Sequence, residues 1–272
     1  MKIFWLLDLE SVGPNIFDES WSRINIMDYQ TQYAECIQKY NMFIRTYILV
    51  DTSKSISIES MTRLQSNSSL WRKERIFRIT ASNFKKYSSL RSTTDPVNVF
   101  KQLQNVPNTI AIRHGKLYEG VAIQHFLKVQ NVFDSSALSG QVGFVVHPSA
   151  PFLGASPDYV VQDKGCIYLL EIKCPYSCFI NKKTIKESAK KSSFFLSCVD
   201  DQLRINKTHS VFLQIQGQLH LCNLKYAYLV VFVPPDDIEF VLVEKEDVSS
   251  VFKTLTEVWF NSLLPHFFSI FN

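Results

Sequence analysis

The chain has 272 residues, of which 46% are hydrophobic and 20% charged, and its formal net charge is +4. This composition is that of an ordinary globular protein and excludes a disordered chain. The length allows one large domain, or one domain with an appended segment, around a full core. The mild positive charge is compatible with a polyanionic partner without requiring one. The six cysteines form no Cys-x-x-Cys pair, which argues against a disulfide framework and a zinc finger.

The first seventy residues carry no recognisable chemistry. The apolar run at residues 3–7 is too short for a signal peptide core or a membrane span. We therefore expect a soluble intracellular protein, in the nucleus or cytoplasm, without a membrane partner. Spaced aromatic and aliphatic side chains at 25–49 predict a helix, whereas the Ser/Thr-rich stretch at 53–69 predicts a loop or linker. We expect segment 1–70 to be partly helical and of unknown role, and the abrupt start leaves open that the chain is a piece of a longer protein.

A dense run of Lys and Arg begins at Trp71 and leads to a helix start signal at Thr80 or Ser82. Arg75, Arg78 and the hydroxyl of Ser82 would meet a helix N-terminus, and this combination favours an anion such as phosphate. The same pattern also fits a solvated basic turn followed by an ordinary cap. The residues alone leave both interpretations open.

Residues 114–128 place their apolar side chains near one face of a helix. Glu119 follows Gly115 by about one turn, so both can line one groove. A single glutamate on an amphipathic helix is usually solvated. Glu119 is therefore a candidate metal ligand only if other acidic side chains lie beside it.

The most informative stretch spans residues 154–176. Asp158 starts an apolar run, a Gly-containing turn at 162–165 reverses the chain, and a second apolar run ends at Glu171 and Lys173. This layout predicts a β-hairpin. Because alternate residues of a strand point to the same face, Glu171 and Lys173 share a face at the mouth of the hairpin, close to Asp158. Two acids and an amine in one pocket can hold a divalent cation and handle a water.

The other elements complete a mixed sheet flanked by helices. The alternating apolar residues of 141–147 predict a strand. A helix is predicted at 211–222, followed by a continuous apolar run at 226–234 that is typical of a buried central strand. Alternation at 238–243 predicts an edge strand. An amphipathic helix is predicted at 247–260.

Two groups of polar residues flank this predicted site. Five lysines lie between 181 and 191 beside a single acid, and the first of them, Lys182 and Lys183, are candidate contacts to a DNA backbone. A lysine-coated helix face would explain the same run. Gln214 and Gln218 lie one turn apart on one face of their helix, where a glutamine could orient a lysine or bind a phosphate.

The ordered series resembles the YqaJ-like viral recombinase, or lambda-exonuclease-like, family of the PD-(D/E)xK nuclease superfamily. The resemblance spans residues 71–233 and rests on the following residues, in chain order: Trp71, Arg75, Ile79-Thr80-Ala81-Ser82, Gly115-Lys116, Tyr118-Glu119, Ser156-Pro157-Asp158, Leu170-Glu171-Ile172-Lys173-Cys174-Pro175 and Gln214-Ile215-Gln216. The short acidic motif alone is weak evidence, but the whole series is specific. It departs from the phage-like pattern at Val211, where that pattern has an aromatic residue.

The resemblance implies an α/β, restriction-endonuclease-like fold with an α-β-β-β-α-β core, in a nuclease domain over residues 71–272. It implies a metal-dependent phosphodiesterase that digests one strand of linear duplex DNA from 5′ to 3′ in recombination or repair. A ring-shaped trimer and a recombination partner protein are weaker implications. Two alternatives remain: a nucleic-acid-binding module without hydrolysis, consistent with the basic segments at 72–78 and 182–191, and an endonuclease of the same superfamily.

The resemblance also implies a role for each polar residue of the series: Asp158, Glu171 and the carbonyl of Ile172 as ligands of Mg²⁺, for which Mn²⁺ would substitute; Glu119 as a further ligand of the metal or its waters; Lys173 beside the attacking water; Gln214 as a support for that lysine; and Arg75 and Ser82 as the binding site of a terminal phosphate. Carboxylate and carbonyl oxygens are the ligands that Mg²⁺ prefers.

Overall fold

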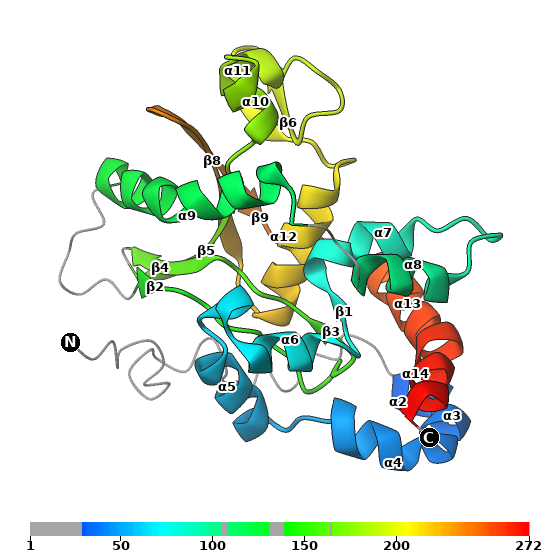
Figure 1. The fold of residues 1–272 in the computed structure, drawn as a ribbon. Coiled ribbons are helices and arrows are strands. Elements are labelled where there is room, and N and C mark those ends of the chain that lie inside the picture. Colours follow the sequence, from blue (N-terminus) through cyan, green and yellow to red (C-terminus); the bar gives the residue numbers. More distant parts are fainter. Residues whose placement is uncertain (1–28, 105–107, 131–138, 164, 272) are drawn as a thin grey trace.

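The computed structural model of the chain describes residues 29–104, 108–130, 139–163 and 165–271 (Figure 1). The apolar run at 3–7 and the first residues of the helix predicted at 25–49 lie outside these ranges. Within the described part of the chain, no helix combines the length and the apolar character that a membrane crossing needs.

Helices pack around the sheet, and several are short. The α-helices are α2 (Tyr29–Gln32), α3 (Ala34–Lys39), α4 (Asn41–Phe43), α5 (Thr52–Met61), α6 (Ser69–Arg75), α7 (Phe84–Ser88), α8 (Pro96–Gln104), α9 (Ile110–Val129), α10 (Tyr176–Ile180), α11 (Ile185–Ser188), α12 (Ser210–Leu221), α13 (Ser249–Val258) and α14 (Leu264–Phe271). Two π-helical turns, η1 (Ile44–Ile48) and η4 (Trp259–Leu263), and two 3₁₀ turns, η2 (Gln65–Asn67) and η3 (Ala81–Asn83), complete them.

The strands form one five-stranded sheet and two small pairs. They are β1 (Ile79–Thr80), β2 (Ser139–Gly140), β3 (Leu153–Gly154), β4 (Tyr159–Asp163), β5 (Cys166–Lys173), β6 (Leu196–Val199), β7 (Gln202–Ile205), β8 (Tyr226–Val233) and β9 (Asp237–Glu244). The main sheet has the order β2-β4-β5-β8-β9. β4 and β5 pair antiparallel as the predicted hairpin, β5 and β8 pair parallel, and β9 lies at the edge. The predicted mixed sheet flanked by helices is thereby confirmed.

The two long helices that carry site residues cover opposite faces of this sheet. Along β8, Leu229 and Val231 join the apolar cluster that contains α12, whereas Val230 and Phe232 join the cluster that contains α9. This alternation follows from the two-residue period of a strand. Side chains of β5 alternate in the same way, so residues of odd and even number on β5 meet different helices. The site can therefore draw on both layers (Figure 1).

The prediction of a strand at 141–147 is wrong. The strand that pairs with β4 is the two-residue β2 just before it, and within 141–147 only Val145 makes a bridge, to Ala155. Side chains of α5 and of its C-cap residue Thr62 take the place of a partner strand: the Gly143 N–H donates to Glu59 Oε1 at 2.9 Å and the Phe144 N–H to Thr62 Oγ1 at 2.7 Å. Phe144 and Val146 are buried against Ile58 of α5, whereas Val142 and Val145 join the apolar cluster that contains α12.

The prediction of a linker at 53–69 is also wrong, because most of this stretch is helical. Asp51 caps α5 by accepting the Lys54 N–H at 2.7 Å. Glu59 is buried and pairs with Arg63 at 2.9 Å, and the hydroxyl of Ser55 donates to the carbonyl of Val146. Ser55 and Thr62 thus point inward and satisfy backbone groups of another segment.

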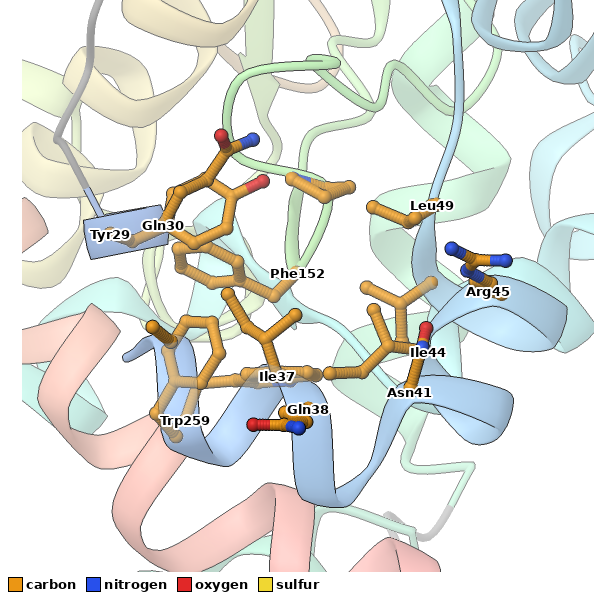
Figure 2. A pocket seen from close by; sticks show the side chains of 14 residues that line it. Tyr29, Gln30, Ile37, Gln38, Asn41, Ile44, Arg45, Leu49, Phe152 and Trp259 are labelled. Carbon is orange, nitrogen blue, oxygen red and sulfur yellow. The ribbon is translucent and has the colours of Figure 1, made fainter. Parts of the chain in front are cut away.

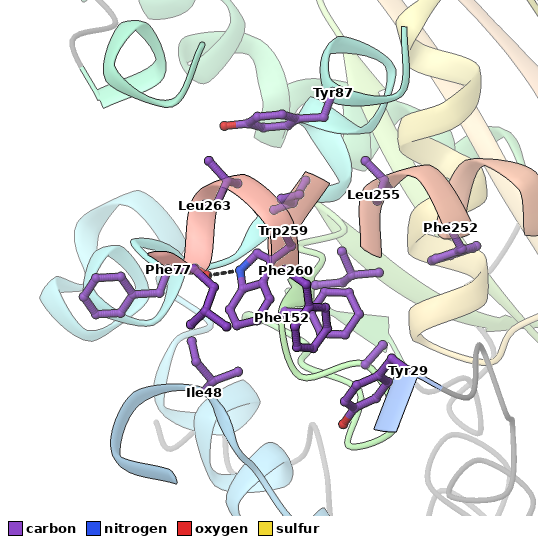
Figure 3. Packing of buried hydrophobic residues seen from close by; sticks show 14 of the residues in the cluster. Tyr29, Ile48, Phe77, Tyr87, Phe152, Phe252, Leu255, Trp259, Phe260 and Leu263 are labelled. Carbon is purple, nitrogen blue, oxygen red and sulfur yellow. Dashed lines mark hydrogen bonds between the residues drawn. The ribbon is translucent and has the colours of Figure 1, made fainter. Parts of the chain in front are cut away.

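Residues before 50 share a core with the C-terminal helices (Figure 3). Tyr33 stacks on Phe260 with ring centroids 4.4 Å apart. The indole N–H of Trp259 donates to the carbonyl of Phe77 at 2.9 Å, which ties η4 to the basic segment that begins at Trp71. The N-terminal and the C-terminal helices of the described chain therefore pack against one another.

Candidate active site

A polar pocket of about 470 Å³ lies at the C-terminal end of β5. It brings together the five predicted catalytic residues and Ile172, contributed by α9, by the residue before β4, by β5 and by α12: Glu119, Asp158, Glu171, Ile172, Lys173 and Gln214. Because helices from both faces and two strands meet at this edge, residues far apart in the sequence share one cavity.

Glu171 and Lys173 share one face of β5, as their spacing predicts. Lys173 Nζ lies 2.5 Å from Glu171 Oε1, and Glu171 is only 2% exposed. Burial lowers the pKa of Lys173, but Glu171 and then Asp158 outweigh this effect and leave the pKa above its ordinary value. Lys173 is therefore a cation at neutral pH in this state of the site.

The helix α12 supplies two amides to the same carboxylate. Gln214 Nε2 donates to Glu171 Oε1 at 2.6 Å, and its oxygen lies 3.4 Å from Lys173 Nζ. One turn further, Gln218 Nε2 donates to Glu171 Oε2 at 2.6 Å. Both carboxylate oxygens of Glu171 thus have donors, and Gln214 contacts the acid and the lysine at once.

Asp158 sits at the mouth of the hairpin. Its Oδ2 accepts the Ile172 N–H at 2.7 Å, and its own N–H donates to the carbonyl of Leu170 at 3.2 Å. These two bonds fix the side chain beside the last residues of β5. Burial raises the pKa of Asp158 well above its ordinary value, and the charges of Glu171 and Glu119 raise it further.

Glu119 lines the same pocket from α9. Burial raises its pKa, and the charge of Glu171 raises it further. Glu171 thus raises the cost of ionising Glu119, and Glu171 and Glu119 raise that of Asp158, with Lys173 as the compensating charge. A divalent cation relieves this kind of repulsion.

The donor set fits a hard divalent cation such as Mg²⁺. Asp158, Glu171 and the Ile172 carbonyl offer oxygens, and Mg²⁺ is usually held by one or two carboxylates together with waters and substrate phosphates. Within the described ranges no three acidic, histidine or cysteine side chains form a ready cage. Both oxygens of Glu171 already have donors, in Lys173 and the two α12 amides.

A second pocket adjoins the first and is lined by Arg72, Arg75 and Arg78. The two pockets share Ile112 and Lys116 as lining residues. The Arg75 guanidinium lies over the Trp71 ring, 3.9 Å from its centroid, and Nη1 is 3.4 Å from the hydroxyl of Ser156. Burial lowers the pKa of Arg75 to about 10, so it stays charged at neutral pH. No carboxylate of the described residues pairs with it.

Arg78, three residues later, is occupied by the protein itself. Its five N–H donors meet five protein acceptors: the carbonyls of Tyr47, Ile48, Glu74 and Pro151, and the carboxylate of Glu74 at 3.0 Å. Its side chain is 1% exposed. Arg78 lines the same pocket as Arg75, but a phosphate that bound Arg78 would have to displace these bonds, so its predicted phosphate contact stays a prediction.

The predicted cap of α7 is absent, since neither Thr80 nor Ser82 caps a helix with its side chain. Ser82 is exposed, and its hydroxyl lies 3.1 Å from that of Thr80, which lines the Arg75 pocket together with Asn83. Lys182 and Lys183 are exposed in the turn between α10 and α11 and line neither polar pocket.

Lys116 had no predicted role, and Gln218 was only a general candidate. Lys116 lies between the two pockets, and its only signal in the sequence was its place inside the Gly115-to-Glu119 motif. A further cavity of about 390 Å³ lies between the N-terminal helices and Phe152 and Trp259 (Figure 2). Its lining includes no acid and, apart from Arg45, no base, so it does not provide the groups that phosphodiester chemistry needs.

Comparisons with known proteins identify the family of the chain. A family model described as the YqaJ-like viral recombinase domain matches residues 70–225, which contain all five predicted catalytic residues. No curated protein matches the chain.

Solved structures of exonucleases resemble the chain. The Shutoff and Exonuclease Protein of Kaposi's sarcoma-associated herpesvirus superposes with a TM-score of 0.52 at 11% identity, covering 91% of this chain and 85% of that one. An alkaline exonuclease of Laribacter hongkongensis gives a TM-score of 0.47 at 18% identity, with 75% and 96% covered. A phage-related exonuclease of Haemophilus somnus gives 0.48 at 12% identity, with 72% and 96% covered. The chain belongs to the YqaJ-like viral recombinase family.

Proposed function

We propose that this protein is a Mg²⁺-dependent exonuclease that degrades one strand of linear duplex DNA from its 5′ end. The observation that carries the proposal is the pair of adjoining pockets, one holding three acids with Lys173 and the other an arginine without a carboxylate partner among the described residues. Two neighbouring sites for phosphate groups match the first phosphates of a strand end. An endonuclease would not need the second site.

Asp158, Glu171 and the Ile172 carbonyl would hold the metal, and Glu119 would reach it or its waters from α9. When bound, the metal supplies a Lewis acid that stabilises charge building on the scissile phosphate. The hydrogen bond from the Ile172 N–H holds the Asp158 side chain beside β5, the strand that carries Glu171. The backbone would therefore not need to rearrange for both acids to bind the metal.

Lys173 would orient the attacking water and offset the negative charge that develops on the phosphate. Its ammonium is already anchored by Glu171 and held near Gln214, so its direction is fixed before substrate arrives. Gln214, which contacts both side chains, would hold Lys173 and Glu171 in fixed positions relative to each other. Such positioning by preformed donors is the main protein contribution to phosphoryl transfer.

Arg75 would bind the terminal 5′-phosphate. Its guanidinium packs on Trp71, and no carboxylate of the described residues neutralises it. Its planar set of N–H donors would therefore be available to bind a phosphate through two hydrogen bonds. Lys116 would contact the strand between this phosphate and the reacting one. Ser82, Lys182 and Lys183 would contact the DNA backbone outside these two pockets.

The decisive experiment compares linear 5′-phosphorylated duplex with covalently closed circular duplex, each with Mg²⁺ or with EDTA. We expect nucleotide release from the linear DNA with Mg²⁺ alone. Cutting of the circle would show an endonuclease instead. Salt-sensitive binding without any cleavage would support the alternative of a binding module that has lost hydrolysis.

Assembly into a ring-shaped trimer and pairing with a recombination protein stay predictions from the family resemblance. Sedimentation of the purified chain, with and without linear duplex, tests the first. A monomer under both conditions would contradict it.

A further inference from the structure

Glu171 is held by two amides of one helix, and the two act on different oxygens. Gln214 donates to Oε1, which also receives Lys173, whereas Gln218 donates to Oε2 at 2.6 Å. One turn of α12 therefore spans the whole carboxylate. The orientation of the acid depends on both ends of this contact.

Gln218 differs from Gln214 in where it lies. Gln214 lines the active pocket, but Gln218 is 1% exposed and does not line it. Substrate cannot reach Gln218 in this arrangement. Whatever Gln218 contributes to the site must therefore act through Glu171.

The oxygen of Gln218 is buried and has no hydrogen-bond partner in the described part of the chain. An unpaired buried acceptor is unfavourable, and an apolar side chain of similar volume would avoid this cost. Gln216, on the same helix, is different: its nitrogen donates to the carbonyl of Glu244 and its oxygen accepts the Glu246 N–H, both at 2.8 Å. Gln216 thus ties α12 to the end of β9, while Gln218 has Glu171 as its polar partner.

We propose that Gln218 is a positioning residue that holds Oε2 of Glu171 against α12, so that Oε1 faces Lys173 and the cavity. A buried carboxylate with one oxygen fixed has fewer orientations to lose when a divalent cation binds. Partners behind a metal ligand typically change metal affinity or activity by about 10–100-fold when they are removed. The consequence for cleavage rests on the proposed nuclease function, whereas the consequence for cation binding does not.

The test uses Gln218→Met in the full chain, with Gln216→Met as the matched control on the same helix. Mn²⁺ is the probe, and its binding is followed by electron paramagnetic resonance in the absence of DNA. For Gln218→Met we expect Mn²⁺ binding weaker by about 10–100-fold and a melting temperature below that of the wild type, because the buried Oε2 of Glu171 loses its donor. For Gln216→Met we expect a lower melting temperature and Mn²⁺ affinity close to that of the wild type.

Linear-duplex cleavage is measured in parallel as a function of Mn²⁺ concentration. Here we expect Gln218→Met to need about 10–100-fold more Mn²⁺ for half-maximal rate. If the wild type cleaves no DNA but Mn²⁺ binding still depends on Gln218, the nuclease proposal fails and the positioning role stands.

Two results would overturn the positioning role. They are unchanged Mn²⁺ affinity in Gln218→Met and absence of Mn²⁺ binding by the wild type. Gln218→Leu, which also lacks the donor, repeats the measurement if the methionine variant is poorly soluble, and failure of both variants to fold counts as a structural role.

Discussion

Gly217 of α12 lies directly against Phe84 of α7. A Cβ added at Gly217 would come within 2.5 Å of the Phe84 ring and 3.1 Å of Ala81 Cβ. The missing side chain lets α12 approach η3 and α7 closely. Because the same helix directs Gln214 toward Glu171, Gly217 sets the distance between the acidic pocket and the segment that follows Arg75.

The first prediction is that Gly217→Ala lowers the free energy of unfolding by about 1–3 kcal/mol, as overpacking of a filled core does. Phe84 is 1% exposed and cannot move into solvent without leaving the core. The melting temperature should fall by about 2–4 °C for each kcal/mol in a chain of this size. Thermal denaturation followed by circular dichroism measures it.

Gly120→Ala is the control. A Cβ at Gly120 would meet no atom within 4 Å, and the residue lies inside α9. Alanine there should keep or raise stability by about 0.4–1 kcal/mol, since it reduces the freedom of the unfolded chain. Equal melting temperatures for the two variants would contradict close packing at Gly217.

The hairpin and its acids were predictable because their signals are local. The spacing of Glu171 and Lys173 fixes their common face once the strand is recognised, and the turn between two apolar runs fixes the pairing. The structure pairs Tyr159 with Leu170 and places Asp158 one residue before that pair. The long helices that carry Glu119 and Gln214 also followed from periodicity.

Contacts between distant segments were not predictable. The pattern at 141–147 suggested a strand, but two of its backbone N–H groups donate to the side chains of Glu59 and Thr62, more than eighty residues earlier in the sequence. Arg75 and Arg78 are equivalent in a basic run. Both line one cavity, and only the fold shows that backbone carbonyls of other segments take up the donors of Arg78, while Arg75 stacks on Trp71.

The second prediction concerns Lys173→Ala. Removing the ammonium takes away the group that would orient the water, so the cleavage rate on linear duplex should fall by about 10²–10⁴-fold. DNA binding, measured by fluorescence anisotropy with Ca²⁺ in place of Mg²⁺, should change much less. Lys186→Ala is the control, because Lys186 is an exposed lysine that pairs with Glu239 at 3.7 Å outside the polar pockets. Equal rates for the two variants would exclude the proposed role.

The third prediction is that Arg75→Met reduces the preference for a 5′-phosphate over a 5′-hydroxyl end. Hydrogen bonds to charged groups contribute about 1.5–3 kcal/mol, so the ratio of kcat/KM for the two ends should fall by roughly 10–100-fold. Arg75→Lys should restore part of the preference, since it keeps the charge without the fork. Lys86→Ala, an exposed lysine of α7, serves as control. An unchanged ratio in Arg75→Met would place the end phosphate elsewhere.

The fourth prediction is that Arg78→Met destabilises the fold. The change leaves the carboxylate of Glu74 and four backbone carbonyls without their donor. Removing one partner of a buried pair costs about 3–5 kcal/mol. Urea denaturation should show a lower midpoint for Arg78→Met than for Arg72→Met, because Arg72 is exposed and bonds only the carbonyl of Ser66 among the described residues. A midpoint equal to that of Arg72→Met would contradict the structural role.

The fifth prediction is a pH-dependent gain of stability in Asp158→Asn without metal. Burial, with Glu171 and Glu119, raises the pKa of Asp158 in the folded state. Below about pH 3.9, the usual value for aspartate, the carboxyl is protonated in folded and unfolded chains alike. Above it the unfolded chain releases the proton first, so the stability of the wild type falls with rising pH until the folded pKa is passed. Each pH unit between the unfolded and the folded pKa lowers the free energy of unfolding by about 1.4 kcal/mol.

In EDTA, the melting temperature of Asp158→Asn should therefore equal that of the wild type near pH 4 and exceed it increasingly toward pH 7. Addition of Mg²⁺ should stabilise the wild type but not the variant, since a ligand that binds the folded state alone raises stability. Asp163→Asn, at the far end of β4, controls for loss of an acid in general. Parallel curves for the wild type and Asp158→Asn across this pH range would show that the pKa of Asp158 is not raised in the folded protein.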